Sequence, residues 1–254
     1  YEINNVYYCP DNIIIDNFEV KKYDKSRYLI IDYFIIDMSK DSKSISLYDN
    51  ELSDSFCSLV KEIKKIDIKN NGSEKKIIIL GSNNEYLEIL IDRDGKIISI
   101  KMDNIYNIGD NFLENNEALQ TLEVPKLTQV GNNFLRWCET IQKLYAPKLA
   151  KIGNFFLNYN RLLEKIDLPN LTEVGDNFLT YNKILQVLYV PNLTKVGNSF
   201  LAYNKILQVL EVPNLTEVGD FFLEDNETLL ELYVPKLINV GSYFLDCNKT
   251  LQEL

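Results

Sequence analysis

Glycine and proline recur at one fixed spacing in the second half of the chain. Seven of the ten glycines and six of the seven prolines lie 22 residues apart. A fixed period of about 20 to 50 residues is typical of proteins whose repeats stack on one another. The sequence therefore predicts a solenoid of six to seven coils over residues 103–254. The periodic residues are Gly109, Gly131, Gly153, Gly175, Gly197, Gly219 and Gly241, with Pro125, Pro147, Pro169, Pro191, Pro213 and Pro235.

Apolar residues also occupy fixed positions in this unit. The unit has the pattern L-x-x-L-x-V-P-x-L-T-x-V-G-x-x-F-L-x-x-N-x-x, as in Leu185–Ile206. A single unit is too short to enclose a core, so stacked units must bury like side chains against like. The aromatic position is unbroken and contains Phe112, Phe134, Phe156, Phe178, Phe200, Phe222 and Phe244.

The unit divides into two short strands and a turn. The L-x-V segment alternates between inward and outward positions, and the proline after it cannot extend a ladder because it has no N–H group. L-T-x-V predicts a second strand. The glycine indicates either a positive φ or a close contact between coils. For F-L-x-x-N we expect a helical or 3-10 turn.

One polar position recurs among the apolar ones. A buried asparagine must find hydrogen-bond partners for its amide, and the backbone of a neighbouring coil can supply them. We therefore expect these side chains to connect adjacent coils. The position holds Asn116, Cys138, Asn160, Asn182, Asn204, Asn226 and Asn248.

Residues 1–102 lack the period and predict a small α+β domain. We expect it to cap the first coil, with an independent binding role as the alternative, because an open solenoid end exposes apolar surface. Asp94-Gly95 is a strong hairpin signal. The calcium-site interpretation of Asp92–Gly95 is weaker, since the acidic residues of a calcium loop do not follow. The expected strands are 12–20, 28–37, 42–48, 75–80, 86–93 and 96–102, and the expected helix is 54–65.

The stretch V-P-N-L-T-K-V-G-N-S-F-L-A-Y-N at Val190–Asn204 resembles the BspA-like class of leucine-rich repeats. The usual pattern of that class is I-P-x-x-V-T-x-I-G-x-x-A-F-x-x-C. Here the unit is one residue shorter between proline and glycine, F-L replaces A-F, and asparagine replaces cysteine except at Cys138. The resemblance covers residues 103–254. It implies a bacterial or protist surface protein that binds other proteins without catalysis.

Composition excludes several kinds of chemistry. The chain has no histidine, which removes Ser-His-Asp and Cys-His nucleophile systems and histidine metal sites. A net charge of −10 disfavours nucleic acids and anionic membranes as partners. The glycine spacing is unlike that of phosphate-binding loops, and carboxylates such as Glu173 and Glu217 recur with the period. We expect no enzyme activity, cofactor or metal, and no apolar run is long enough to insert into a membrane.

The outward position before each proline alternates between acid and tyrosine. Tyrosine gives a large contact area at low entropic cost and is favoured at protein interfaces. The pattern predicts a strip that binds a basic or mixed protein surface. The alternative is that tyrosine and carboxylates are simply good residues for an exposed strand surface. The strip contains Glu123, Tyr145, Asp167, Tyr189, Glu211 and Tyr233.

A second aromatic position lies in the turn and contains Trp137, Tyr159, Tyr181 and Tyr203. We expect these rings to stack as a stabilising ladder. The alternative is an exposed patch for carbohydrate or protein.

The predicted function is recognition of a protein, such as a host or matrix protein, by an extracellular or cell-surface solenoid. An intracellular scaffold or effector is the alternative, and a structural spacer is a third. The chain starts at Tyr1 without a leader, so we expect that a leader was removed or that the chain is part of a longer protein. Because it stops at Leu254 without a polar capping unit, we expect further repeats or end-to-end packing on another molecule.

Overall fold

A computed structural model describes residues 63–71, 74–81, 83–93 and 96–252, together with seven short strands between residues 2 and 47. The chain divides into two compact units, Tyr1–Ile105 and Tyr106–Leu254. The described residues of both units form strands and turns, and none of them forms a helix.

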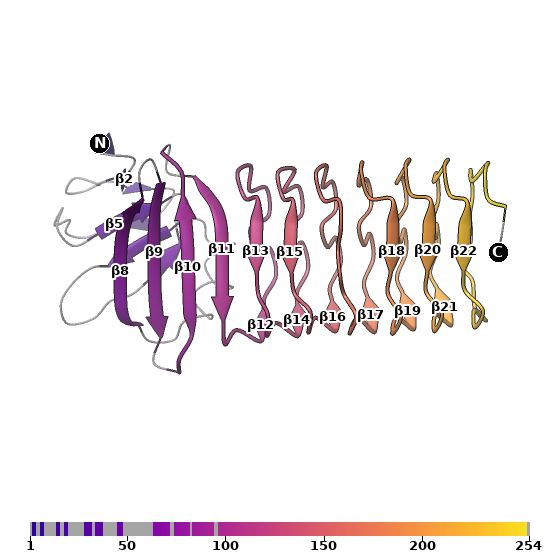
Figure 1. The fold of residues 1–254 in the computed structure, drawn as a ribbon, viewed down its shortest axis with the longest axis horizontal. Coiled ribbons are helices and arrows are strands. Elements are labelled where there is room, and N and C mark those ends of the chain that lie inside the picture. The colour runs from indigo at the N-terminus through magenta and orange to yellow at the C-terminus, as the bar shows by residue number, and fades with distance from the viewer. Residues whose placement is uncertain are drawn as a thin grey trace. The chain divides into compact units, whose positions relative to one another are not determined.

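The first unit contains antiparallel strands (Figure 1). One sheet has the order β1 (Glu2–Ile3), β2 (Val6–Tyr7), β5 (Tyr28–Ile31), β6 (Phe34–Asp37) and β7 (Ile45–Leu47), and β3 (Ile14–Ile15) pairs with β4 (Phe18–Glu19). Four longer strands pair in chain order: β8 (Ile63–Asn71), β9 (Glu74–Gly81), β10 (Tyr86–Ile91) and β11 (Ile97–Asp103).

The predicted helix over 54–65 is not supported. Residues 54–62 lie outside the described part, and Ile63–Lys65 begin β8. This strand pairs with β9, so a long-range ladder replaces the local helical spacing. The expected strand over 28–37 is also wrong in detail, because it consists of β5 and β6, which pair from Tyr28 with Asp37 to Ile31 with Phe34. The antiparallel pairing of β10 with β11 confirms the predicted hairpin, although Asp94 and Gly95 lie outside the described residues.

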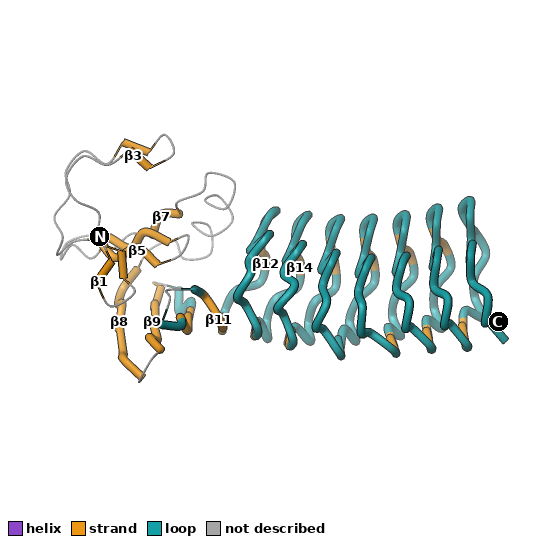
Figure 2. The backbone as a smooth tube through the Cα atoms, turned by 90° about the horizontal axis from the view of Figure 1, so that it is seen from above, coloured by secondary structure: helices purple, strands orange, loops and turns teal. Residues whose placement is uncertain are grey.

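The second unit is a solenoid with two rows of parallel strands (Figures 1 and 2). We call them the first and second strand rows. The first contains β13 (Thr121–Glu123), β15 (Lys143–Tyr145), β18 (Val187–Tyr189), β20 (Val209–Glu211) and β22 (Glu231–Tyr233). The second contains β12 (Asn107–Ile108), β14 (Gln129–Val130), β16 (Lys151–Ile152), β17 (Glu173–Val174), β19 (Lys195–Val196) and β21 (Glu217–Val218). Partners are 22 residues apart, as Lys151 and Glu173 show, which confirms the repeat.

The core is built from identical side chains on successive coils. The aromatic rings from Phe112 to Phe244 stack with centroids 5.2 to 5.6 Å apart. Leu119, Leu122 and Val124 of the first coil are at most 1% exposed. The apolar positions of the repeat, which we predicted to be buried, therefore form the core. The last coil is more open, and Ile238 and Val240 are 77% and 55% exposed.

The turn after each glycine is not helical, contrary to our expectation. Three alternate residues in each turn have a positive φ, for example Ser199 at 54°, Leu201 at 54° and Tyr203 at 62°. The left-handed conformation costs roughly 1–2 kcal/mol per non-glycine residue. This conformation turns the backbone toward neighbouring coils. The N–H of Leu201 donates to the backbone carbonyl of Phe178, and the N–H of Tyr203 donates to the backbone carbonyl of Glu224. In a helical turn, most backbone N–H and C=O groups would instead form hydrogen bonds within one coil.

The glycine position is explained by close contact between coils rather than by a positive φ. A Cβ atom on Gly153 would lie 2.6 Å from the carbonyl carbon of Gly131, a distance that real Cβ atoms do not adopt. The residue after each glycine reinforces this contact, since the Asn132 Oδ1 accepts a hydrogen bond from the N–H of Asn154 at 2.8 Å. Glycine is therefore required for the coil spacing.

The asparagine position connects adjacent coils, as predicted. Asn204 is fully buried, and its Nδ2 donates to the carbonyl oxygens of Leu179 at 2.9 Å and Leu201 at 2.7 Å. Its Oδ1 accepts from the N–H of Asn182 at 2.8 Å. In the coil without asparagine, the Cys138 thiol donates to the carbonyl of Leu113 at 2.9 Å.

Candidate protein-binding surface

The acid–tyrosine strip, defined by the six residues from Glu123 to Tyr233 named above, lies on the outer face of the first strand row. The reason is the strand alternation: Leu188 is 1% exposed, whereas its neighbours Val187 and Tyr189 are 56% and 54% exposed. Tyr145 and Tyr233 are similarly exposed, at 49% and 56%. Among the described residues, none of the three tyrosine hydroxyls has a hydrogen-bond partner. Their rings and hydroxyls are therefore available to another molecule.

The structure brings the strip residues together in two groups. Glu123 pairs with Tyr145 in one group. In the other, Tyr189 pairs with Glu211 and Glu211 with Tyr233. Asp167 is exposed but does not belong to a strand. The strip is therefore not one continuous ladder, in contrast to the uniform pattern of the sequence.

The interruption occurs at Glu164–Asp167, in the third coil. Elsewhere the ladder is regular. The Val124 N–H donates to the backbone carbonyl of Tyr145 at 2.8 Å, and the Val190 N–H donates to the backbone carbonyl of Glu211 at 3.2 Å. The equivalent bonds from Ala146 and Leu168 are absent from the described part of the chain.

A hollow of about 590 Å³ lies at this interruption. We call it the coil gap, and it is lined by Glu164, Lys165, Ile166, Asp167, Ile184, Gln186, Val187 and Tyr189. Sequence reasoning missed the gap. The sequence does carry a signal for the missing pairing on the other side of the third coil, toward the second coil. Regular pairing would place Lys143 directly beside Lys165, and like charges opposite each other destabilise a ladder. Lys143 instead forms an ion pair with Glu123 at 3.2 Å.

The second aromatic position forms the predicted ladder. Tyr181 stacks between Tyr159 at 4.4 Å and Tyr203 at 4.5 Å, measured between ring centroids. Trp137 meets Tyr159 edge-on at 6.2 Å. A hydrogen bond to Glu224, together with burial, raises the pKa of Tyr203 to about 12. Because their faces are occupied by each other, the stacked tyrosines stabilise the turn and offer mainly their edges to a ligand.

The recurring carboxylates of the second strand row belong to ion pairs. Lys195 lies 2.7 Å from Glu217, and Lys151 lies 3.9 Å from Glu173. The hydrogen bond from Lys195 to Glu217 also raises the pKa of that lysine. Each carboxylate faces a lysine of a neighbouring coil on an exposed surface. This arrangement lacks the paired acids in a sheltered site that acid–base catalysis uses.

In the described part of the chain, potential metal ligands do not cluster, and the buried cysteine is not a nucleophile. No group of three or more potential metal ligands occurs among these residues. Burial raises the pKa of the Cys138 thiol to about 12, so the thiol stays protonated at neutral pH. We also find no helix in this part that could cross a membrane.

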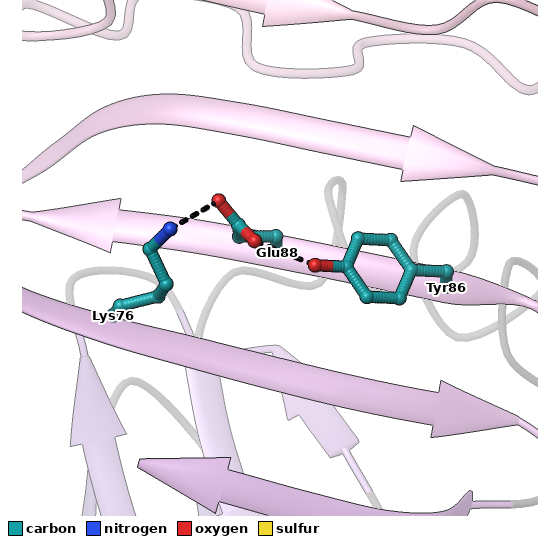
Figure 3. Close-up of polar contacts among 3 residues, drawn as sticks. All are labelled: Lys76, Tyr86 and Glu88. Carbon is teal, nitrogen blue, oxygen red and sulfur yellow. Dashed lines mark hydrogen bonds and ion pairs between the residues drawn. The ribbon is translucent and has the colours of Figure 1, made fainter. Parts of the chain in front are cut away.

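One polar cluster in the first unit lies on the sheet of β9 and β10 (Figure 3). The Glu88 carboxylate accepts hydrogen bonds from Lys76 at 2.7 Å and from the Tyr86 hydroxyl at 2.5 Å. Burial raises the pKa of Glu88, but Lys76, Tyr86 and the charge of Lys101 outweigh it, and the net shift is downward. Burial and Glu88 raise the pKa of Tyr86 to about 12. Both oxygens of the carboxylate are engaged, so the cluster is an internal cross-strand network.

Comparison with known families gives one match. A family model described as BspA type leucine rich repeat region matches six copies, over residues 93–208 and 151–252. Neither the curated proteins nor the solved structures give a match. The family match covers more than half of the chain, begins at the end of the first unit and extends over nearly all of the solenoid.

Proposed function

Because the chain belongs to the BspA-type leucine-rich repeat family, we propose that it is a protein-binding module that contacts its partner through the acid–tyrosine strip. The observation that supports this proposal is the exposure of Tyr145, Tyr189 and Tyr233 on one strand row, next to carboxylates. Tyrosine contributes a large apolar contact area together with a polar tip, at a small cost in side-chain entropy.

The carboxylates favour a partner with a basic or mixed surface. Glu211 lies between Tyr189 and Tyr233 in the ladder, so each tyrosine has a negative neighbour. Charge complementarity of this kind increases the association rate and selects among partners. No part of this arrangement requires catalysis, and the proposed role is recognition alone.

We place this recognition at a cell surface or in a secreted protein, as in an adhesion protein, because the repeat resembles that of surface proteins. The alternative is an intracellular scaffold that uses the same strand row. Labelling of intact producing cells with a membrane-impermeant reagent distinguishes the two. Modification of the chain supports the surface role, and modification only after lysis supports the scaffold.

Substitution of the three tyrosines tests the strip. The whole chain and its Tyr145→Ser, Tyr189→Ser, Tyr233→Ser variant are immobilised and probed with an array of purified matrix and serum proteins. We expect the variant to lose at least tenfold in affinity for the captured protein, with unchanged circular dichroism.

A control carries three serines on the second strand row, at Gln129, Lys151 and Lys195, which are also exposed. This variant should bind normally. Equal affinity of the tyrosine variant and the unchanged chain would rule out the strip as the binding site.

A further inference from the structure

We propose that a groove along the stacked tyrosines of the turn binds an acidic polysaccharide that carries one carboxylate on each sugar. The groove is a hollow of about 460 Å³ and shares no residue with the acid–tyrosine strip, so this inference adds a second ligand to the proposed function. We call it the basic–tyrosine groove. It is lined by Tyr159, Tyr181 and Tyr203, by Arg161, Lys183 and Lys205, and by Asn182.

Positive charge in the lining is the first part of the argument. Arg161 forms an ion pair with Glu139 at 2.9 Å, and Lys205 forms one with Glu227 at 3.6 Å. Both carboxylates come from the coils on either side of the groove. The side chain of Lys183, in the coil between the two pairs, has no ion pair or hydrogen bond in the described part of the chain. None of the described residues that line the groove is acidic, although the chain has a net charge of −10.

The spacing of the three cations selects a polymer. Arg161, Lys183 and Lys205 occupy one repeat position on successive coils, which lie about 4.8 Å apart. Like charges on neighbouring coils repel one another, and anionic groups bound along them remove that repulsion. The cations are spread along the groove instead of converging on one point. They therefore suit a chain with repeated carboxylates better than a single small anion, and a sugar unit of a linear chain is similar in length to the coil spacing.

The tyrosines favour sugar as the repeating unit. The Tyr181 side chain is exposed, and its ring is stacked between those of Tyr159 and Tyr203, so a ligand meets the ring edge that carries the hydroxyl. A phenol hydroxyl can both donate and accept hydrogen bonds, as sugar hydroxyls require. The Tyr203 hydroxyl donates to Glu224, and its lone pairs can still accept from a sugar.

An acidic peptide fits the groove less well. Backbone groups of the turn are already bonded between coils: the Tyr181 N–H donates to the Ala202 carbonyl at 3.1 Å, and the Tyr203 N–H donates to the Glu224 carbonyl at 2.8 Å. These donors are not available to the backbone of an extended peptide, which would have to bind mainly through its side chains. The net charge of the chain disfavours nucleic acid, whose phosphates are far more densely spaced than the three cations. At physiological salt, charges more than about 8 Å away are largely screened, so the cations of the groove dominate locally.

The test titrates trigalacturonate, which has three sugars and three carboxylates, into the whole chain by calorimetry. We expect a dissociation constant below about 1 mM. Two matched ligands are the controls, the methyl ester of trigalacturonate and a blocked peptide of three glutamates. Both should bind at least tenfold more weakly. Equal binding of the ester would overturn the role of the cations, equal binding of the peptide would overturn the assignment to a sugar, and no binding of trigalacturonate would overturn the proposal.

Substitutions at Lys183 localise the binding. Lys183→Glu introduces the residue that the repeat already carries at Glu139 and Glu227, so the coil should still fold, and affinity for trigalacturonate should fall at least tenfold. Lys183→Gln should lower it at least threefold. The matched control is Lys148→Glu, which makes the same change of charge at an exposed corner outside the groove and should bind normally. Unchanged affinity of Lys183→Glu, or an equal loss in Lys148→Glu, would overturn the site.

Two further variants separate the groove from the strip and test the hydroxyl. The variant Tyr145→Ser, Tyr189→Ser, Tyr233→Ser should bind trigalacturonate normally, because the groove contains none of these residues. Loss of binding in this variant would move the sugar to the strip and overturn the groove. Tyr181→Phe keeps the stacked ring and removes its hydroxyl, and should weaken binding at least threefold. Unchanged affinity of Tyr181→Phe would overturn the contribution of the tyrosine edge.

Discussion

At the scale of single residues, the solenoid depends on side chains that satisfy backbone groups of another coil. Threonine is an example: Thr194 Oγ1 donates to the Thr172 carbonyl at 3.1 Å, and Thr216 donates to Thr194 at 3.0 Å. Asn192 Nδ2 likewise donates to the Pro169 carbonyl at 2.7 Å. The recurrence of threonine and asparagine in the sequence therefore has a structural origin.

We predict that Asn204→Ala lowers the free energy of unfolding by about 3 kcal/mol, because it leaves buried backbone groups without partners. Urea denaturation measures this loss. Asn204→Cys should cost less, since Cys138 forms the equivalent hydrogen bond, and Cys138→Asn should not destabilise. Equal losses for the alanine and cysteine variants would contradict a hydrogen-bonding role.

Glu88 makes stability depend on pH. The pKa of Glu88 is lowered in the folded state. Its contribution to the free energy of unfolding is therefore complete above the unfolded pKa of about 4.5, and it is lost as the pH falls through the pKa of the folded state. Glu88→Gln should lower the free energy of unfolding at pH 7 by about 0.5–1 kcal/mol, since the network is partly exposed. The difference between the two proteins should shrink at pH 3. A difference that is independent of pH would contradict the assigned network.

At the scale of elements, the two strand rows behave differently. The second row pairs without a break from β12 to β21. The first row is interrupted at the third coil, where Lys143 and Lys165 would otherwise be neighbours. The strand positions and the core follow from the period, because stacking requires like residues at like places. Lys143 and Lys165 are particular to their coils, so a consensus of the repeat does not show this interruption.

Hydrogen exchange checks the interruption directly. We predict that the amides of Glu164 and Lys165 exchange at least tenfold faster than those of Gln208 and Val209, which occupy the same repeat positions and donate to the Gln186 carbonyl. Residue-resolved exchange measured by NMR gives these rates. Comparable protection at the four amides would mean that the ladder is continuous.

The turn and the first unit show which elements sequence reasoning could not predict. Leucine and tyrosine at a positive φ, as at Leu201 and Tyr203, contradict local preference and are stabilised by hydrogen bonds between coils. The apolar spacing at the end of the expected helix is overridden by the pairing of β8 with β9. In both cases the deciding contacts lie far apart in the sequence.

At the scale of the whole molecule, the acid–tyrosine strip is the surface that we propose for binding. The outward direction of Tyr145, Tyr189 and Tyr233 could be predicted from the strand alternation, whereas their division into two groups could not. That the first unit caps the first coil, and that the last coil packs end to end on another molecule, remain predictions.

Hydroxyl-radical footprinting of the whole chain, alone and saturated with its captured protein, tests the central claim most directly. Two sets of tyrosines in the same chain serve as reporter and control. Our account predicts that Tyr145, Tyr189 and Tyr233 become protected, while the stacked Tyr159 and Tyr181 keep their reactivity. Protection of the stacked tyrosines, with Tyr145, Tyr189 and Tyr233 unchanged, would contradict it.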